Sequence, residues 1–314
     1  MKRLALAGAT LILAVAMATV TASAAYPGHN GQIAFDDGSV SPMRIGVVNP
    51  DGTGEKTLSQ RGDHSPRYSR DGSTIVFFST RDQSGANNAD AEIFTMSADG
   101  SNQTQLTFND LEDQVPAWTA DGRIVFTRRN ATGQWNIWIM DANGDHQRQL
   151  TYLAGVSAWP APAPNGHQLA FSSKYRGQFH IYTMRLDGTK LRQISPDDTV
   201  DWAPEWSPRG NDIVFTREAL APNTSAGVDE DVFIVHSDGT RLRQLTRNPA
   251  RADLFPSWSP DRRFVIFDGA TDWQGPNWHS NLITYELPTA NESTVGRPDI
   301  GGYPGWQPVS SEGS

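Results

Sequence analysis

Apolar and polar positions alternate along most of this chain in short runs, a pattern that predicts strands rather than helices. The runs are rich in β-branched and aromatic residues, and no long stretch follows the helical period of about 3.6 residues. The pattern recurs in units that each begin at a proline: Pro66, Pro116, Pro160, Pro204, Pro256 and Pro304. These prolines are 50, 44, 44, 52 and 48 residues apart, a period typical of four-stranded propeller blades.

Each unit contains four pieces of strand length. In the unit that starts at Pro116 they are residues 116–119, 124–126, 137–140 and 149–151. The first carries a Pro-x-Trp segment, the second ends in Phe, the third alternates, and the fourth is short and polar. A polar outermost strand discourages pairing with other chains, so this order matches the innermost-to-outermost order of a blade. The pairs Asp71-Gly72 and Asp99-Gly100 recur between pieces and supply the positive φ of tight hairpin turns.

The two ends of the chain complement each other. Residues 32–59 contain a second, third and fourth piece without a first, whereas residues 304–308 form a first piece with nothing after it. Paired together, they make one composite blade beside five full blades that start at residues 66, 116, 160, 204 and 256. The sequence therefore predicts an all-β, six-bladed propeller, closed by pairing the C-terminal strand with the N-terminal half-blade.

The repeat also resembles a known family. The pattern D-x-x-P-x-W-S-P-D-G, a strand ending in Phe, I-[FY]-x-M-x-x-D-G and Q-L-T is similar to the TolB-like, WD-repeat-like propeller repeat, most closely at residues 253–261. The resemblance implies a six-bladed propeller. TolB itself carries an α/β domain before its propeller, and we expect this chain to lack one.

The N-terminus predicts export. Lys2 and Arg3 precede an apolar run at residues 4–20, and Ala22-Ser23-Ala24 supplies small residues for cleavage. We expect a signal peptide at residues 1–24, a propeller at 25–308 and a flexible tail at 309–314, although a membrane anchor is the alternative interpretation of the first segment. The mature chain is then periplasmic or secreted, with no stable membrane insertion.

Composition narrows the classes of partner. A formal net charge of −9 argues against a general nucleic-acid binder. The absence of cysteine excludes a disulfide framework and a lipid-anchored cysteine, so stability must come from the core.

One face of the predicted ring carries the variable loops, and we call it the loop face. The loops between second and third strands emerge there together with the links between blades, and the longest are residues 79–91, 216–230 and 268–280. Four links place an aspartate three residues before the repeat proline, whereas Ser157 and Gly301 stand at that position in the other two units. The four residues are Asp63, Asp113, Asp201 and Asp253.

A ring of carboxylates around a channel suits Ca²⁺ or a basic peptide segment. The alternative is that each aspartate caps its own turn or pairs with a neighbouring blade. The candidate cationic partners, just beyond the second strands, are Arg81, Arg128, Lys174 and Arg217.

Tryptophans outside the repeat pattern suggest a second binding feature. Trp273 and Trp278 lie in one of the long loops, Gln134-Trp135 in another variable loop, and Tyr175 and Trp202 lie nearby in the repeat scheme. Such residues stack on sugar rings or contact a protein partner, unless they simply pack over the channel mouth. By contrast, the tryptophans of the Pro-x-Trp segments are expected in the core: Trp118, Trp206, Trp258 and Trp306.

No catalytic motif is present. The sequence has no G-x-S-x-G, no H-E-x-x-H and no cysteine-based site, and its seven histidines share no ligand spacing. His64 beside Asp63 is the one candidate acid–base pair, although neighbouring residues on a strand point to opposite sides. The sequence therefore favours a non-enzymatic scaffold that binds a protein or peptide, without a cofactor. The alternative is a propeller that binds or cleaves an extracellular polysaccharide.

Overall fold

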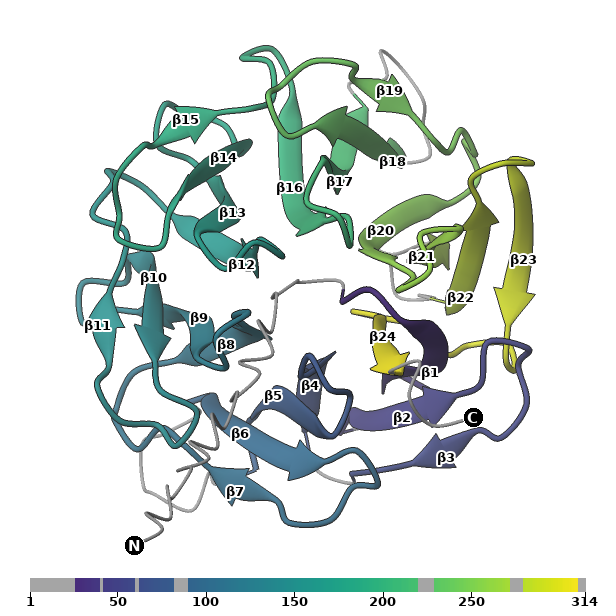
Figure 1. Cartoon of the computed structure of the whole chain (residues 1–314), viewed down its shortest axis with the longest axis horizontal. Coiled ribbons are helices and arrows are strands. Elements are labelled where there is room, and N and C mark those ends of the chain that lie inside the picture. Colours follow the sequence, from purple (N-terminus) through teal and green to yellow (C-terminus); the bar gives the residue numbers. More distant parts are fainter. Residues whose placement is uncertain are drawn as a thin grey trace, which may run out of the picture.

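The fold follows from the repeated strand pattern. The computed structural model describes residues 26–39, 42–59, 62–81, 90–219, 229–271 and 279–309. Within these ranges the chain forms 24 strands and no helix, and the strands make six four-stranded antiparallel sheets. The sheets surround a central axis as the blades of a six-bladed propeller (Figure 1). The predicted all-β propeller is confirmed, and no described helix is long and apolar enough to cross a membrane.

Five blades are continuous in sequence, and in each of them the strands follow one another from the innermost to the outermost. The first three consist of β4 (Asp63–Tyr68), β5 (Thr74–Ser79), β6 (Glu92–Ser97) and β7 (Thr104–Gln105); β8 (Asp113–Trp118), β9 (Ile124–Arg129), β10 (Trp135–Met140) and β11 (Arg148–Gln149); and β12 (Ser157–Pro162), β13 (Gln168–Ser173), β14 (His180–Arg185) and β15 (Arg192–Gln193). The other two consist of β16 (Val200–Trp206), β17 (Asp212–Ala219), β18 (Asp229–His236) and β19 (Arg243–Gln244); and β20 (Ala252–Trp258), β21 (Phe264–Thr271), β22 (His279–Glu286) and β23 (Asn291–Val295).

The sixth blade joins the two ends of the chain. Its strands are β24 (Gly305–Val309), β1 (His29–Asp37), β2 (Arg44–Val48) and β3 (Lys56–Thr57), in this order from the axis. Ile33 of β1 lies opposite Trp306 of β24 in the antiparallel register. The predicted composite blade is therefore confirmed, and it removes the free sheet edges that an open ring would leave.

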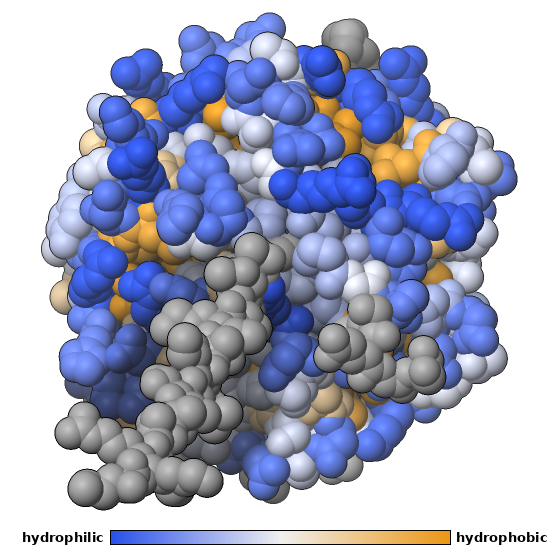
Figure 2. Space-filling model, in the orientation of Figure 1, coloured by the Kyte–Doolittle hydropathy of each residue, from blue (hydrophilic) through white to orange (hydrophobic). Residues whose placement is uncertain are grey.

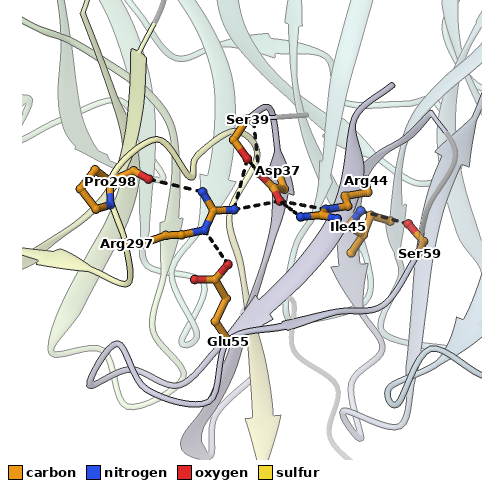
Figure 3. A network of polar contacts seen from close by, with 8 residues as sticks. All are labelled: Asp37, Ser39, Arg44, Ile45, Glu55, Ser59, Arg297 and Pro298. Carbon is orange, nitrogen blue, oxygen red and sulfur yellow. Dashed lines mark hydrogen bonds and ion pairs between the residues drawn. The ribbon is translucent and has the colours of Figure 1, made fainter. Parts of the chain in front are cut away.

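A polar network reinforces this closure (Figure 3). Arg297, in the link from β23 to β24, donates to Asp37 at 3.0 Å and to Glu55 at 2.9 Å. Arg44, opposite Asp37 in the register, donates to the same carboxylate from its Nε at 2.9 Å. The last complete blade is thus tied to the composite blade by charged hydrogen bonds as well as by strand pairing.

Two expectations from the sequence need correction. The residues of strand β23 were not located in the sequence, because residues 291–295 lack the Q-L-T signature and no Asp-Gly turn precedes them. Two of the long loops are also shorter than expected, because β17 pairs with β18 as far as Ala219 and Asp229, and β21 with β22 as far as Thr271 and His279.

The core lies between neighbouring blades. The phenylalanine that recurs in each second strand has an exposed fraction of 1% or less: Phe35, Phe77, Phe126, Phe171, Phe215 and Phe267. Around these residues, six apolar clusters each combine side chains from two adjacent blades. The four repeat tryptophans are buried as well, as predicted. Burial of this apolar surface supplies the main favourable term for folding a chain without disulfides.

An irregularity recurs where each innermost strand meets its proline. The residue before the proline has a φ between 45° and 53° in all six blades, although none of these residues is glycine: Ser65, Val115, Trp159, Ala203, Phe255 and Tyr303. In the five complete blades the register of the innermost pair shifts at this point, as in a β-bulge. Side chains on either side of the bulge are thereby re-aimed, which decides what reaches the channel.

Candidate functional site

A central cavity of about 90 Å³ lies at the axis, lined by residues of all six innermost strands. In each complete blade the innermost strand begins at the blade link, on the loop face, and ends at the tight turn that follows it. These turns lie on the other face of the ring, which we call the turn face. Positions early in an innermost strand therefore lie near the loop face, and later positions lie near the turn face.

The four predicted aspartates are completely buried, and each is held by an arginine. Three of these arginines are the ones proposed from the sequence, and they come from the same blade as their aspartate. The pairs are Arg81 Nη2 to Asp63 Oδ2 at 2.5 Å, Arg128 Nε to Asp113 Oδ1 at 2.6 Å, and Arg217 Nε to Asp201 Oδ1 at 2.6 Å. Each pair has a second hydrogen bond between the same two groups, so the contact is two-pronged.

Aromatic rings complete these pairs. The Arg81 guanidinium lies 4.8 Å from the Phe94 ring centroid, and Arg217 lies 4.5 Å from that of Phe233. A guanidinium that is bound by a carboxylate and stacked on an aromatic ring is suited to burial. The carboxylates therefore point into their own blades, toward the arginines, rather than converging at the axis.

The blade that starts at Asp253 reaches the same result differently. Gly269 stands opposite Asp253, at the position that Arg128 and Arg217 occupy opposite their aspartates, and Arg251 fills this space. Its Nε donates to Asp253 Oδ1 at 2.5 Å, and a Cβ at residue 269 would lie 2.8 Å from the Arg251 side chain. The glycine thus leaves room for Arg251, which replaces the arginine of the facing strand.

The two units without an aspartate also differ in their partners. Ser157 faces Ser173, with their hydroxyls 3.2 Å apart, and Lys174 is exposed with its ammonium over the Phe179 ring. Gly301 is packed so closely that a Cβ there would lie 1.9 Å from the Ser280 hydroxyl. No carboxylate fits at that position.

The candidate pair of Asp63 and His64 does not form. Whereas Asp63 points to Arg81, the His64 ring stacks on Phe78 and its Nδ1 lies 3.6 Å from Asp36 Oδ2. Burial raises the pKa of Asp36, and the same carboxylate accepts a hydrogen bond from the backbone N–H of Ser65 at 2.8 Å. His64 thus has a structural setting at the junction of β4 with the composite blade.

Aromatic side chains from four blades meet within the channel. Trp202 packs against Trp159 and Phe255, with centroid distances of 5.6 and 5.1 Å. Phe255 stacks on Tyr303 at 3.8 Å, and the Trp159 indole N–H donates to the Tyr303 hydroxyl at 3.5 Å. We call these four residues the aromatic layer. Of its members the sequence analysis named Trp202 alone.

The remaining candidates from the aromatic set do not join the aromatic layer. Gln134 donates to the carbonyls of Leu153 and Gly155, while Tyr175 packs edge-on against Tyr182. Trp273 and Trp278 lie outside the described residues, as does the predicted signal peptide. The glycan hypothesis that rested on those two tryptophans stays a prediction.

Two exposed aromatic residues were missed by the sequence analysis. Phe108 and Tyr152 have exposed fractions of 75% and 78%, and each directly follows the Q-L-T segment of its blade. Asn109 donates its backbone N–H to Glu92 at the start of β6, which places Phe108 at the loop face. The signal that could have identified them is an aromatic residue directly after Q-L-T in two adjacent blades. On the face that Figure 2 shows, small hydrophobic areas (orange) lie between hydrophilic side chains (blue).

Metal ligands do not gather in the part of the chain that the structure describes, where no group of three or more His, Cys, Asp or Glu residues could hold an ion. In addition, the four link carboxylates are already bound by guanidinium groups. Calcium would have to displace an arginine from a buried carboxylate in order to bind there.

Comparison with known proteins rests on structure. No model of a protein family matches the chain, and no curated protein matches its sequence. TolB from Acinetobacter baumannii superposes with a TM-score of 0.69 and 19% identity, over 88% of this chain and 67% of its own. The chain has a TolB-like propeller fold. A putative TolB from Agrobacterium tumefaciens matches this TolB-like propeller with a TM-score of 0.65 and 16% identity, over 90% and 99% of the two chains.

The same fold occurs in a protein with an enzyme's name. Hydrazine synthase from Kuenenia stuttgartiensis matches with a TM-score of 0.70 and 15% identity, over 91% of this chain and 48% of its own. A shared propeller fold therefore does not decide activity, and the function of this TolB-like propeller must be argued from its residues.

Proposed function

We propose that this chain is an extracytoplasmic, non-enzymatic scaffold that binds a protein or peptide at its loop face and at the mouth of its channel. The observation that carries the proposal is the pair of exposed aromatic residues, Phe108 and Tyr152. Large aromatic residues that stay in water at matching positions of neighbouring blades are typical of protein interfaces.

The groove beside Phe108 supports a contact of this kind. It is lined by Phe94, Phe108 and Asn109 together with the carboxylate of Glu92. Burial raises the pKa of Glu92 to about 7, opposed by hydrogen bonds from Asn109 and Thr107. A partner side chain with an apolar body and a donor at its tip would complement this groove.

The channel mouth limits how far a peptide can enter. The aromatic layer crosses the channel, because Trp159 and Tyr303 come from opposite blades and form a hydrogen bond with each other. A peptide segment entering from the loop face therefore ends at Trp202 and its neighbours. This geometry favours a short, capped contact over a threaded one.

The chemistry of the loop face favours binding over catalysis. Catalytic acids and bases need access to substrate, whereas Asp63, Asp113, Asp201 and Asp253 are buried and paired with arginines. The proposed location outside the cytoplasm rests on the N-terminal sequence pattern. N-terminal sequencing of the mature protein would test it, because cleavage at residue 24 or 25 is expected.

The test compares opposite faces of the ring. The mature chain, the variant F108S/Y152S and the control L191S/L242S are immobilised and exposed to envelope and medium fractions of the source cell. Leu191 and Leu242 are exposed by 39% and 37% and directly precede outermost strands, at the turn face. Captured proteins are then quantified by mass spectrometry.

We expect a protein that is retained by the wild type and the control, and reduced at least tenfold by F108S/Y152S. Equal retention by all three chains would overturn the loop-face proposal. A glycan array signal without any protein that depends on Phe108 and Tyr152 would instead favour the polysaccharide hypothesis.

A further inference from the structure

The aromatic layer divides the channel into two parts. Three residues of the layer directly precede a repeat proline, and Ser65 and Ala203 hold the same position in their strands. Arg67 and Glu205 come two residues later, so they lie on the turn-face side of the layer. At the other end of the same cavity, the Tyr26 hydroxyl contacts the carbonyls of Trp118 and Thr119 at 3.4 and 3.2 Å. We call the space between the aromatic layer and Tyr26 the chamber.

The wall of the chamber is mostly apolar. It consists of the layer residues Trp159, Phe255 and Tyr303 together with prolines at the repeat positions of four blades: Pro116, Pro160, Pro204 and Pro256. Among the residues that the structure describes, two charged side chains line it, Arg67 and Glu205. A concave apolar wall with a few placed polar groups is the usual form of a small-molecule site.

The two charges face each other across the axis. Arg67 belongs to β4 and Glu205 to β16, which are opposite strands in the ring of six. Glu205 uses Oε1 to accept hydrogen bonds from the Ser257 hydroxyl at 3.0 Å and from the Trp258 backbone N–H at 3.1 Å. Glu205 is partly buried, and among the described residues no hydrogen bond reaches its Oε2 and no ion pair joins it to Arg67.

Arg67 is likewise only partly engaged. Its Nη1 donates to the carbonyls of Pro66 at 2.9 Å and of Tyr303 at 3.0 Å. Both acceptors are neutral, so no carboxylate among the described residues compensates the guanidinium by direct contact. Burial raises the pKa of Glu205, while the positive charge of Arg67 lowers it.

A carboxylate and a guanidinium that are partly buried in an apolar chamber, without direct contact between them, lose part of their hydration and form no ion pair in exchange. A cationic ligand would satisfy Glu205 and be repelled by Arg67, and an anionic ligand would have the reverse difficulty. A ligand that carries both charges satisfies both groups. We propose that the chamber is a binding site for a free amino acid, whose ammonium group is held by Glu205 and whose carboxylate is held by Arg67.

The apolar body of this ligand would contact the proline and aromatic walls. The site lies behind the aromatic layer, so it does not depend on the loop-face proposal. Loss of amino-acid binding and loss of protein capture are therefore separate results.

The test uses calorimetry on the mature protein with ligands that share one side chain. L-phenylalanine carries both charges, phenethylamine keeps the ammonium group alone, and 3-phenylpropionate keeps the carboxylate alone. L-leucine and L-alanine extend the series to smaller side chains. We expect at least one amino acid to bind, and the two single-charge compounds to bind at least tenfold more weakly than L-phenylalanine or not at all.

Substitutions then assign the charges. Glu205→Gln and Arg67→Gln should each weaken the binding of the amino acid at least tenfold. Glu112→Gln, at an ion pair outside the chamber, should leave this affinity unchanged. Circular dichroism verifies that each variant is folded, and the ligand series on the wild type is decisive if one is not. Binding of no amino acid, or equal binding of phenethylamine, would overturn the proposal.

Discussion

The backbone N–H of Phe255 donates a hydrogen bond to the hydroxyl of Thr216 across a blade boundary, and the two atoms lie 3.2 Å apart. The same contact recurs between Ala203 and Ser172 at 3.1 Å, and between Ser65 and Asp36 at 2.8 Å. In each case the residue that follows the buried phenylalanine of a second strand holds the positive-φ residue of the next blade. These hydrogen bonds therefore fix the bulge that shapes the channel.

Thr216→Val should destabilise the protein by about 1–3 kcal/mol, because it leaves the Phe255 N–H without its acceptor. Thr127→Val is the matched control, since the buried Thr127 hydroxyl has no hydrogen-bond partner among the described residues. The control should be neutral or slightly stabilising. Urea unfolding measures both, and equal losses in the two variants would contradict an inter-blade role for Thr216.

Neighbouring residues Glu112 and Asp113 allow a second comparison. Asp113→Ala should cost about 3–5 kcal/mol, because the buried Arg128 would lose its partner. Glu112→Ala removes an ion pair with Arg129 that is largely exposed, and should cost about 0–1 kcal/mol. Chemical denaturation of both variants decides the matter. A small effect in Asp113→Ala would show that the buried pairs are dispensable.

Asp268 should make stability depend on pH. Burial raises its pKa to about 7, with repulsion from Asp36 and Asp253, against about 3.9 in an unfolded chain. The folded state then binds the proton more tightly, so this contribution to stability is complete below about pH 4 and is lost as pH rises to about 7.

Between about pH 5 and about pH 8 the wild type should lose about 2–3 kcal/mol through this group, and Asp268→Asn should not. Glu92, whose pKa is raised to about 7, contributes equally to both proteins, whereas the repulsion between Asp253 and Asp268 is part of the effect of the substitution. The difference between the two unfolding curves therefore reports Asp268. Parallel curves for wild type and variant would refute the assignment.

Calcium should leave the protein unchanged. Because each link aspartate is bound by an arginine, millimolar calcium chloride should produce no rise in melting temperature and no heat in calorimetry. Magnesium at the same ionic strength is the control for general salt effects. A calcium-specific shift would revive the carboxylate-ring hypothesis and direct attention to the channel mouth.

The strand order and the closure of the ring were predictable because they depend on local signals. Asp71-Gly72 specifies a turn, and the phenylalanine of each second strand marks a buried position, whatever the rest of the chain does. The strand β23 was missed because its residues lack the repeat signature, and pairing with β22 forms it all the same. The arginine partners of the link aspartates were predictable because Arg128 and Arg217 lie on the facing strand and Arg81 comes two residues after the end of β5.

The sequence by itself determined a ring of six blades, since each blade repeats the same short-range pattern of apolar residues and turns. Only the tertiary structure decided what the axis contains. Arg67 and Glu205, like Trp159 and Tyr303, come from opposite blades that share no local signal. They line the same channel because ring closure brings six innermost strands together and a positive φ before each proline re-aims their side chains. The link aspartates, for the same reason, turn away from the axis into their blades.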